Sequence, residues 1–359
     1  MRKFKFVLIL AVVSFLTVGI YTLFIRSIDE SDFVVETVKG DPKQSVVRSV
    51  HAEIYDQGLK NLDYNVGLDG HVQKTAGNLI TSLFNNPIDE EGEPTDFRRF
   101  IASDKVTTLE QEGITYGIGI KDKNKWELQY WNAGKQRVVK KIFPEPSEAQ
   151  KLGEIDLIPY QRVENSLYVY AQDYATNLET LLYKINLKND TVQKINLPYT
   201  SKKYTYILGI HDETIVYYTS EGVEGSDATK ETVYLSNGKT VQPLKGLDLS
   251  DAFQTKLSID GTKLIMFKDE LKGLRWTVYD LTSKKMKKYS MILPHTKDGD
   301  VLNKFIEPKN DMIYMGSQAE DGVINIRVVD ALSKRVVYEG NIKDKLKRKE
   351  TMFNTLVLN

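Results

Sequence analysis

The chain has 359 residues, with 49 lysines and arginines balanced by 49 aspartates and glutamates, and it contains no cysteine. The absence of cysteine excludes a lipidated cysteine anchor, disulfides and thiolate chemistry. A charge balance near zero argues against nucleic acid as a partner, because nucleic-acid-binding domains are strongly basic. The length suffices for one large domain or two ordinary ones, each with its own core.

The first 25 residues have the pattern of a membrane anchor, because Arg2, Lys3 and Lys5 precede an uncharged apolar stretch over residues 6–25. At about 1.5 Å per residue such a stretch spans the roughly 30 Å of bilayer hydrocarbon, whereas the apolar region of a cleavable signal has about 7–15 residues. The basic residues favour the cytoplasmic side. We predict a cytoplasmic tail (1–5), a single transmembrane helix (6–25) in the cell membrane and an extracytoplasmic remainder. A cleaved secretory signal is the alternative.

Residues 26–100 form a membrane-proximal segment that contains the strand-like pieces DFVVETV, VRSVHAEIYD and NLITSLF. The acidic stretch PIDEEGEPTD at 87–96 includes proline and glycine, so it is the expected linker at the end of this segment. The segment is either a stalk or small subdomain, or a source of strands for the domain that follows.

Five similar units follow between residues 101 and 359. Each contains a polar turn and a short apolar or aromatic strand, followed by a polar loop and two more strand-like runs joined by a tight turn. If the polar turn is a hairpin that joins this strand to one before it, each unit of about 48 residues has four short strands, which is typical of a β-propeller blade. The first apolar positions are Ile114, Leu167, Ile215, Leu264 and Met312, which lie 53, 48, 49 and 48 residues apart.

The turn SIDGTKL at 258–264 is the clearest start of a unit. Asp260 is expected to accept hydrogen bonds from local backbone amides, and Gly261 to supply the positive φ that a tight turn requires. The turn resembles the Ser-x-Asp-Gly-x-x-Leu turn of TolB-like blades, so residues 100–359 are similar to the WD40-like and TolB-like β-propeller superfamily. The other four units lack Asp-Gly, and the Gly-His and Trp-Asp pairs of WD40 blades are absent.

The C-terminal stretch TMFNTLVLN at 351–359 occupies the position of a first strand with no unit after it. Strands from the N-terminal side are expected to complete this last blade. The predicted fold is therefore all-β: a β-propeller of about six four-stranded blades, with five or seven as alternatives, closed by N- and C-terminal strands and preceded by the transmembrane helix.

The sequence contains no recognisable motif for a cofactor or a metal, and we predict neither. The four histidines share no metal-ligand spacing, and residues 122–124 begin like a calcium loop but lack its glycine. The glycines at 117–119 lie in a predicted strand and suggest strand glycines or a bulge rather than a dinucleotide site. The basic stretches 283–288 and 343–349 suit an anionic envelope polymer, lipid headgroups or a solvated strand edge, and we expect the edge.

Polar loops at one end of the predicted blades form the candidate binding face. In a four-stranded blade, the loop between the second and third strands lies at the same end as the links between blades. These loops are acidic and the links carry aromatic, hydroxyl and basic groups, so the face suits a protein, a peptide, a sugar or a cation. The candidate binding residues are Asp173, Tyr199, Thr200, Lys202, Glu221, Asp227, Asp269, Glu270, His295, Thr296, Lys297, Glu320 and Asp321.

Together these patterns predict a bacterial, membrane-anchored, extracytoplasmic protein that binds a protein, peptide or envelope polymer as a scaffold or accessory subunit. A sensor that passes a ligand signal through its span to a membrane partner is one alternative. A propeller enzyme that acts on glycan or peptide through carboxylates near the axis is another. No Gly-x-Ser-x-Gly elbow, phosphate-binding loop or HExxH motif is present, so we expect no enzymatic activity.

Overall fold

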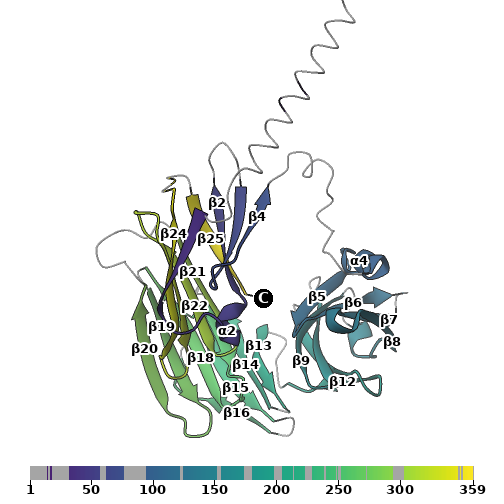
Figure 1. Ribbon diagram of the computed structural model, residues 1–359. Helices are drawn as coiled ribbons and strands as arrows, with labels where there is room; N and C mark the ends of the chain where they lie inside the picture. The colour runs from purple at the N-terminus through teal and green to yellow at the C-terminus, as the bar shows by residue number, and fades with distance from the viewer. Residues whose placement is uncertain are drawn as a thin grey trace, which may run out of the picture. The chain divides into compact units, whose positions relative to one another are not determined.

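The computed structural model describes residues 14, 17, 32–56, 62–76, 94–121, 124–151, 155–173, 180–197, 204–212, 214–222, 229–237, 240–247, 249, 252–271, 273–293, 303–346, 348 and 351–358. These residues form an all-β structure (Figure 1). The helices described over their whole length are α2 (Ser45–Arg48), α4 (Thr95–Ile101) and two short 3-10 helices, Ala133–Lys135 and Ala149–Lys151.

No helix within these described residues has the length and apolar character needed to cross a bilayer. The predicted span at 6–25 lies outside the described residues, except for Ser14 and Thr17.

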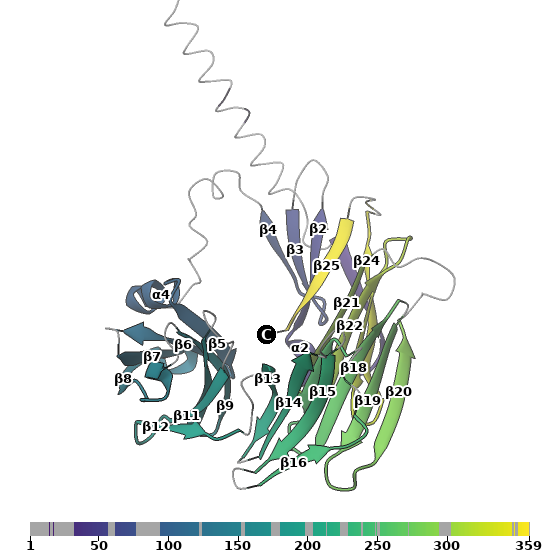
Figure 2. The same cartoon turned by 180° about the vertical axis from the view of Figure 1, so that it is seen from behind.

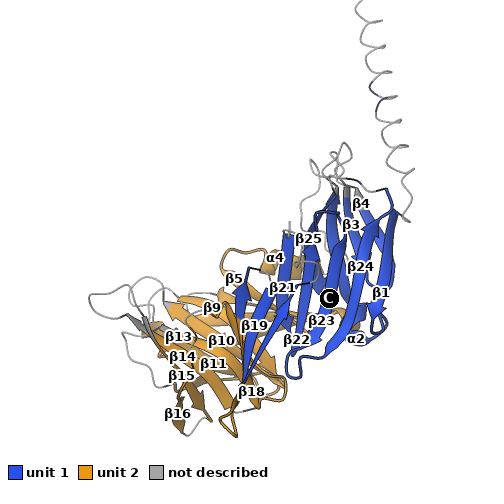
Figure 3. Cartoon of the chain, turned by 90° about the vertical axis from the view of Figure 1, so that its left-hand side faces the viewer, with its two compact units in different colours: residues 1–84, 268–278, 287–359 blue, residues 85–267, 279–286 orange. Residues whose placement is uncertain are grey.

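The chain divides into two compact units, which Figure 3 shows in different colours. Unit 1 comprises residues 1–84, 268–278 and 287–359, and unit 2 comprises residues 85–267 and 279–286. Each unit is therefore built from segments that are distant in the sequence.

Unit 2 contains three complete four-stranded sheets, each made from antiparallel strands that follow one another in the sequence. The first contains β5 (Val106–Gln111), β6 (Ile114–Lys121), β7 (Lys125–Asn132) and β8 (Arg137–Pro144). The second contains β9 (Ile155–Val163), β10 (Ser166–Asp173), β11 (Thr180–Asn186) and β12 (Thr191–Ile195). The third contains β13 (Tyr204–His211), β14 (Thr214–Gly222), β15 (Thr229–Ser236) and β16 (Val241–Leu244).

A fourth sheet contributes residues to both units, because the division falls within its strands β18, β19 and β20. Its strands are β17 (Gln254–Leu257), β18 (Lys263–Glu270), β19 (Gly273–Asp280) and β20 (Met286–Ile292).

The short apolar runs in the sequence are strands whose two faces are both buried. In β10, Leu167 and Val169 point into the core shared with the β5–β8 sheet, and Tyr168 points into the core shared with the β13–β16 sheet. Successive side chains of a strand point to opposite faces, so a strand between two sheets is apolar at nearly every position. This arrangement explains why the repeated runs do not alternate between apolar and polar residues.

The glycines of β6 make room for α4. The pairing of β6 with β5 and β7 has no register shift, so the segment contains no bulge. A Cβ atom on Gly117 would lie 2.9 Å from Ile101 Cγ2 and 3.0 Å from Phe100 Cε1. On Gly119 it would lie 2.7 Å from the carbonyl oxygen of Lys105. The predicted strand glycines are thus explained by the close approach of a helix and its following turn.

The turn before β18 has the predicted chemistry. Asp260 Oδ1 accepts hydrogen bonds from the Thr262 amide (3.0 Å) and from the hydroxyls of Ser258 (2.6 Å) and Thr262 (2.8 Å). Gly261 has a φ of +67°, and a Cβ atom there would lie 2.3 Å from His211 Cγ. Both a positive φ and a close neighbour therefore require glycine at this position.

These hydrogen bonds make the stability of the chain depend on pH. The Ser258 hydroxyl and the Thr262 amide hold the pKa of Asp260 well below its ordinary value. A carboxyl whose pKa is lower in the folded state stabilises the fold above its unfolded pKa of about 3.9, and this contribution is lost as the pH falls below that value. Between about pH 5 and pH 2 the free energy of unfolding should therefore fall more steeply for the wild type than for Asp260→Asn. Urea titrations of the detergent-solubilised chain at a series of pH values measure both slopes, and parallel slopes would contradict the assignment.

Unit 1 contains one five-stranded and one four-stranded sheet. The five-stranded sheet has, in spatial order, β1 (Phe33–Lys39), β24 (Val336–Asp344), β23 (Ile324–Asp330), β22 (Met312–Gln318) and β21 (Asn303–Lys309). The four-stranded sheet has, in spatial order, β25 (Thr351–Leu358), β2 (Val50–Asp56), β3 (Leu62–Gly67) and β4 (Val72–Ala76), which lie side by side in Figure 2.

The prediction that the two ends of the chain share a sheet is confirmed, because β25 pairs antiparallel with β2. Of the strand-like pieces in the membrane-proximal segment, VRSVHAEIYD contains β2 of the closing sheet, whereas DFVVETV forms β1 on the edge of β24. There Glu36 forms an ion pair with Lys343 at 2.6 Å, which favours this edge. NLITSLF lies outside the described residues.

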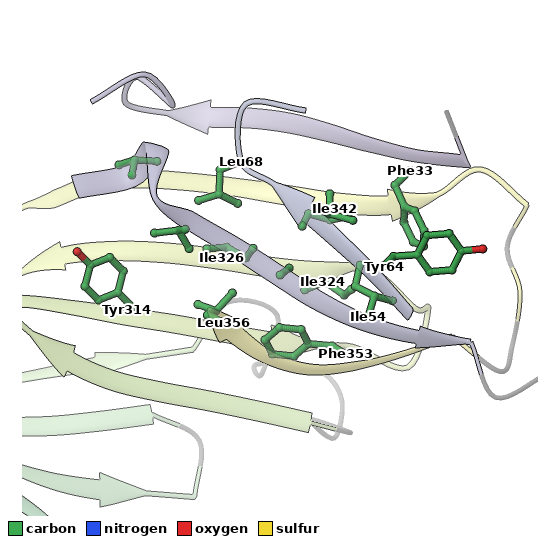
Figure 4. Packing of buried hydrophobic residues seen from close by; sticks show 14 of the residues in the cluster. Phe33, Ile54, Tyr64, Leu68, Tyr314, Ile324, Ile326, Ile342, Phe353 and Leu356 are labelled. Carbon is green, nitrogen blue, oxygen red and sulfur yellow. The ribbon is translucent and has the colours of Figure 1, made fainter. Parts of the chain in front are cut away.

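A shared hydrophobic core joins the two sheets of unit 1. Figure 4 shows Phe33 of β1, Tyr64 of β3 and Phe353 of β25 packed with isoleucines of β23 and β24. The rings of Phe33 and Tyr64 meet edge to face, with centroids 4.9 Å apart. The N-terminal and C-terminal strands therefore depend on the same core for their burial.

Candidate functional site

The predicted binding face has a counterpart in unit 1. Strands of a sheet run antiparallel, so the loop between the second and third strands lies at the end where the fourth strand finishes. The β18–β19 loop, the β22–β23 loop and the β24–β25 link all lie at such ends. We call this region the loop end of unit 1, and its described residues are Asp32, Asp269, Glu270, Leu271, Lys304, Gln318, Glu320, Asp321, Asp344, Lys345, Leu346, Arg348 and Thr351.

Side chains at the ends of the strands hold neighbouring sheets together. The Lys304 ammonium, near the start of β21, donates to both carboxylate oxygens of Asp269 (2.7 and 2.8 Å) and to the carbonyl of Glu270 (3.0 Å). Gln318, the last residue of β22, donates to the carbonyl of Thr351 and accepts from the Phe353 amide, both at 2.8 Å. The loops of three sheets thus meet at one end of the unit.

Arg348 is the centre of a polar cluster at the loop end of unit 1. Its guanidinium donates through Nε and Nη2 to the two oxygens of Asp344, at 2.7 and 3.1 Å. Nη1 lies 3.1 Å from the Tyr64 hydroxyl and 3.3 Å from Asp32 Oδ2. The guanidinium also lies over the rings of Phe33 and Tyr64, 5.3 and 5.4 Å from their centroids. One side chain therefore connects the β24–β25 link, the start of β1 and β3.

Asp344 is ionised in this cluster although its side chain is only 7% exposed. Burial alone would raise the pKa of this carboxyl. The hydrogen bonds from the Arg348 guanidinium and from the amides of Leu346 and Arg348 outweigh burial and lower it. The cluster is consequently a fixed ion pair that supports the loops.

The predicted acids that the structure describes are largely engaged within unit 1. The Asp269 carboxylate forms an ion pair with the Lys304 ammonium, and Glu270 Oε1 lies 2.5 Å from Arg275 Nη2. Asp321 accepts a hydrogen bond from the Val323 amide at 3.0 Å, as in an Asx turn. Glu320 is exposed in the same turn. Most of these carboxylates therefore shape the loops themselves.

Two apolar side chains project from the loop end of unit 1. Leu271, at the tip of the β18–β19 loop, is 86% exposed, and Leu346, in the β24–β25 link, is 61% exposed. A single exposed leucine is ordinary on a protein surface. Two of them on loops fixed by the Lys304 and Arg348 contacts give the face apolar contact points of defined position.

The structure brings only part of the predicted site together. Asp269, Glu270, Glu320 and Asp321 lie in unit 1 at its loop end. Asp173 ends β10 and Glu221 lies in β14, both in unit 2, and their side chains are not described. The remaining predicted residues lie outside the described residues: Tyr199, Thr200, Lys202, Asp227, His295, Thr296 and Lys297.

Sequence reasoning missed Arg348, Asp344 and Gln318. The stretch 343–349 was interpreted as a solvated basic edge, but Lys343 pairs with Glu36 and Arg348 with Asp344. The short spacing between Asp344 and Arg348 was the only signal in the sequence. Among the residues that the structure describes, no group of three or more histidine, aspartate or glutamate side chains could hold a metal ion.

No family model and no curated protein matches the chain. Among solved structures, TolB from Acinetobacter baumannii is 12% identical with a TM-score of 0.38, covering 85% of this chain and 66% of that one, just under two thirds. An uncharacterized protein from Listeria monocytogenes is 8% identical with a TM-score of 0.40, covering 87% and 83%. The β-propeller domain of the Trilobed protease from Pyrococcus furiosus is 10% identical with a TM-score of 0.38, covering 79% of each chain.

The described strands form six sheets, five of four strands and one of five, consistent with a divergent β-propeller of about six blades. No family is identified. The similarity to solved structures is too low to carry an argument about this chain. The fold assignment therefore rests on the order of the strands in the six sheets.

Proposed function

We propose that this chain is a membrane-anchored, extracytoplasmic protein that binds a protein, peptide or envelope polymer through the loop end of its propeller blades. The observation that supports this function is the combination of fixed loops and exposed apolar tips in unit 1. Leu271 and Leu346 are exposed on loops held by Lys304 and Arg348, so little conformational entropy is lost when a partner covers them.

Purification of partners with the full-length chain from detergent-solubilised membranes tests the proposal. The double variant Leu271→Asp/Leu346→Asp places charges on the two apolar tips, and we expect at least about a tenfold loss of recovered partner, since burying one leucine contributes about 1.5–3 kcal/mol. Val38→Asp is the matched control, because Val38 is 63% exposed in the same unit but lies toward the other end of β1.

Equal recovery with the double variant and the control would remove the loop end of unit 1 as the binding face. Failure to recover any reproducible partner, together with turnover of an envelope glycan or peptide by the purified chain, would replace the binding function with an enzymatic one.

A further inference from the structure

The described part of the N-terminal segment begins at the loop end of unit 1. Phe33, the first residue of β1, pairs with Asp344, the last residue of β24. The carbonyl of Asp32 accepts a hydrogen bond from the Lys345 amide at 2.8 Å, and its carboxylate lies 3.3 Å from Arg348. The chain therefore enters unit 1 at the same end as the β24–β25 link that carries Leu346.

Few residues separate this entry point from the predicted anchor. The uncharged apolar stretch ends at Ile25, so only residues 26–31 lie between it and Asp32. Even a fully extended chain spans at most about 3.6 Å per residue, which limits the distance from Ile25 to Asp32 to about 25 Å. If residues 6–25 cross the bilayer, Asp32 lies close to the membrane surface.

The opposite end of β24 lies a full strand length away from this entry point. Ser333 lies in the turn between β23 and β24, before the nine residues of β24 that lead to Asp344. At about 3.3 Å per residue the strand separates its two ends by roughly 25–30 Å. An anchor that holds Asp32 near the membrane therefore favours an orientation in which Leu346 is near the bilayer and Ser333 is away from it.

The chemistry of the loop end of unit 1 favours a protein over lipid as its partner. Leu271 and Leu346 offer apolar contacts, and the exposed charges near them are of both signs: Lys345 precedes Leu346, and Glu320 and Asp321 lie in the neighbouring β22–β23 loop. Charges of both signs give no net attraction to anionic headgroups, whereas an apolar protein surface accepts the leucines and leaves these charges at its rim.

We propose that the loop end of unit 1 faces the bilayer and binds the apolar extracytoplasmic surface of a membrane-embedded protein. This inference rests on the anchor in the proposed function. The proposal names a membrane-embedded protein, rather than a cell-wall polymer or a soluble protein, as the ligand of this face.

The orientation is measured with single cysteines, which are unique labels because the chain has none of its own. Leu346→Cys and Ser333→Cys in the full chain are labelled with a fluorescent donor and reconstituted in phosphatidylethanolamine–phosphatidylglycerol vesicles with an acceptor lipid. We expect several-fold more energy transfer from position 346 than from position 333. Equal or greater transfer from position 333 would overturn the orientation. If neither protein floats with the vesicles, the anchor and with it the proposed function fail.

The partner class is tested by a photoreactive amino acid at Leu271 or Leu346 in intact cells, with Val38 as the control position of similar exposure to Leu346. We expect both loop positions, but not Val38, to form adducts with a protein that stays in the membrane after alkaline washing. Adducts with lipid, adducts with a protein that the washing releases, or a pattern no different from that of Val38 would each overturn the proposal.

Discussion

Replacement of Arg348 by alanine is expected to lower the free energy of unfolding by about 3–5 kcal/mol, the usual effect of removing one partner of a buried ion pair. The Asp344 and Asp32 side chains are only 7% and 12% exposed, and both would lose their cationic partner. The variant would also lose the hydrogen bond to the Tyr64 hydroxyl and the contact with the Phe33 ring. Chemical denaturation of the detergent-solubilised full chain, followed by circular dichroism, measures the change.

Two companion variants make the Arg348 result specific. Arg348→Lys keeps the charge but lacks the planar fork that bonds both oxygens of Asp344, so its loss of stability should be intermediate. Arg335→Ala, at an exposed position in the β23–β24 turn, should change stability by no more than about 0.5 kcal/mol. If Arg348→Ala behaves like Arg335→Ala, the guanidinium does not hold the ends of the chain together.

Gln318→Leu should cost about 2–5 kcal/mol, because leucine fills a similar volume but forms neither of the two hydrogen bonds to β25. Gln318 is 2% exposed, so water cannot readily replace its contacts with the Thr351 carbonyl and the Phe353 amide. We also expect the amides of β25 to exchange hydrogen faster in this variant, since the closing strand loses a bridge to β22. Hydrogen-exchange mass spectrometry of a peptide covering 351–358 reports on this directly.

Gln73→Leu is the control for this experiment, because Gln73 is an exposed residue of β4 in the same closing sheet. It should leave both the stability and the exchange of β25 nearly unchanged. Equal exchange in Gln318→Leu and Gln73→Leu would mean that pairing with β2 alone holds the closing strand.

The repeat was predictable because its causes are local. Leu167, Ile215 and Leu264 were taken as the first apolar positions of strands, and β10, β14 and β18 begin one residue before them. Turn residues such as Asp260 and Gly261 act on their own neighbours, and burial on both faces makes each inner strand an apolar run. The turn residues and the apolar runs therefore each produce a recognisable pattern within about ten residues of sequence.

The closing sheet was predictable only in outline. The leftover strand at 351–359 required partners from the other end of the chain, and β2, β3 and β4 supply them. No local pattern distinguished β1 from β2, because both are short stretches of strand-forming residues. Their separation depends on which edge offers a matching register, and on the pairing of Glu36 with Lys343 across 307 positions of sequence.

The candidate binding face, too, was predictable from the sequence only in part. The sequence determined that the loops after each inner strand are acidic, that residues 6–25 are apolar and that only six residues separate this stretch from Asp32. Only the tertiary structure decided that Lys304 pairs with Asp269 across 35 positions of sequence, and that Leu271 and Leu346 remain as exposed apolar side chains. Ion pairing and exposure depend on which chain segments come into contact. For residues 30 or more positions apart, the sequence alone does not show that contact, because the packing of the sheets decides it.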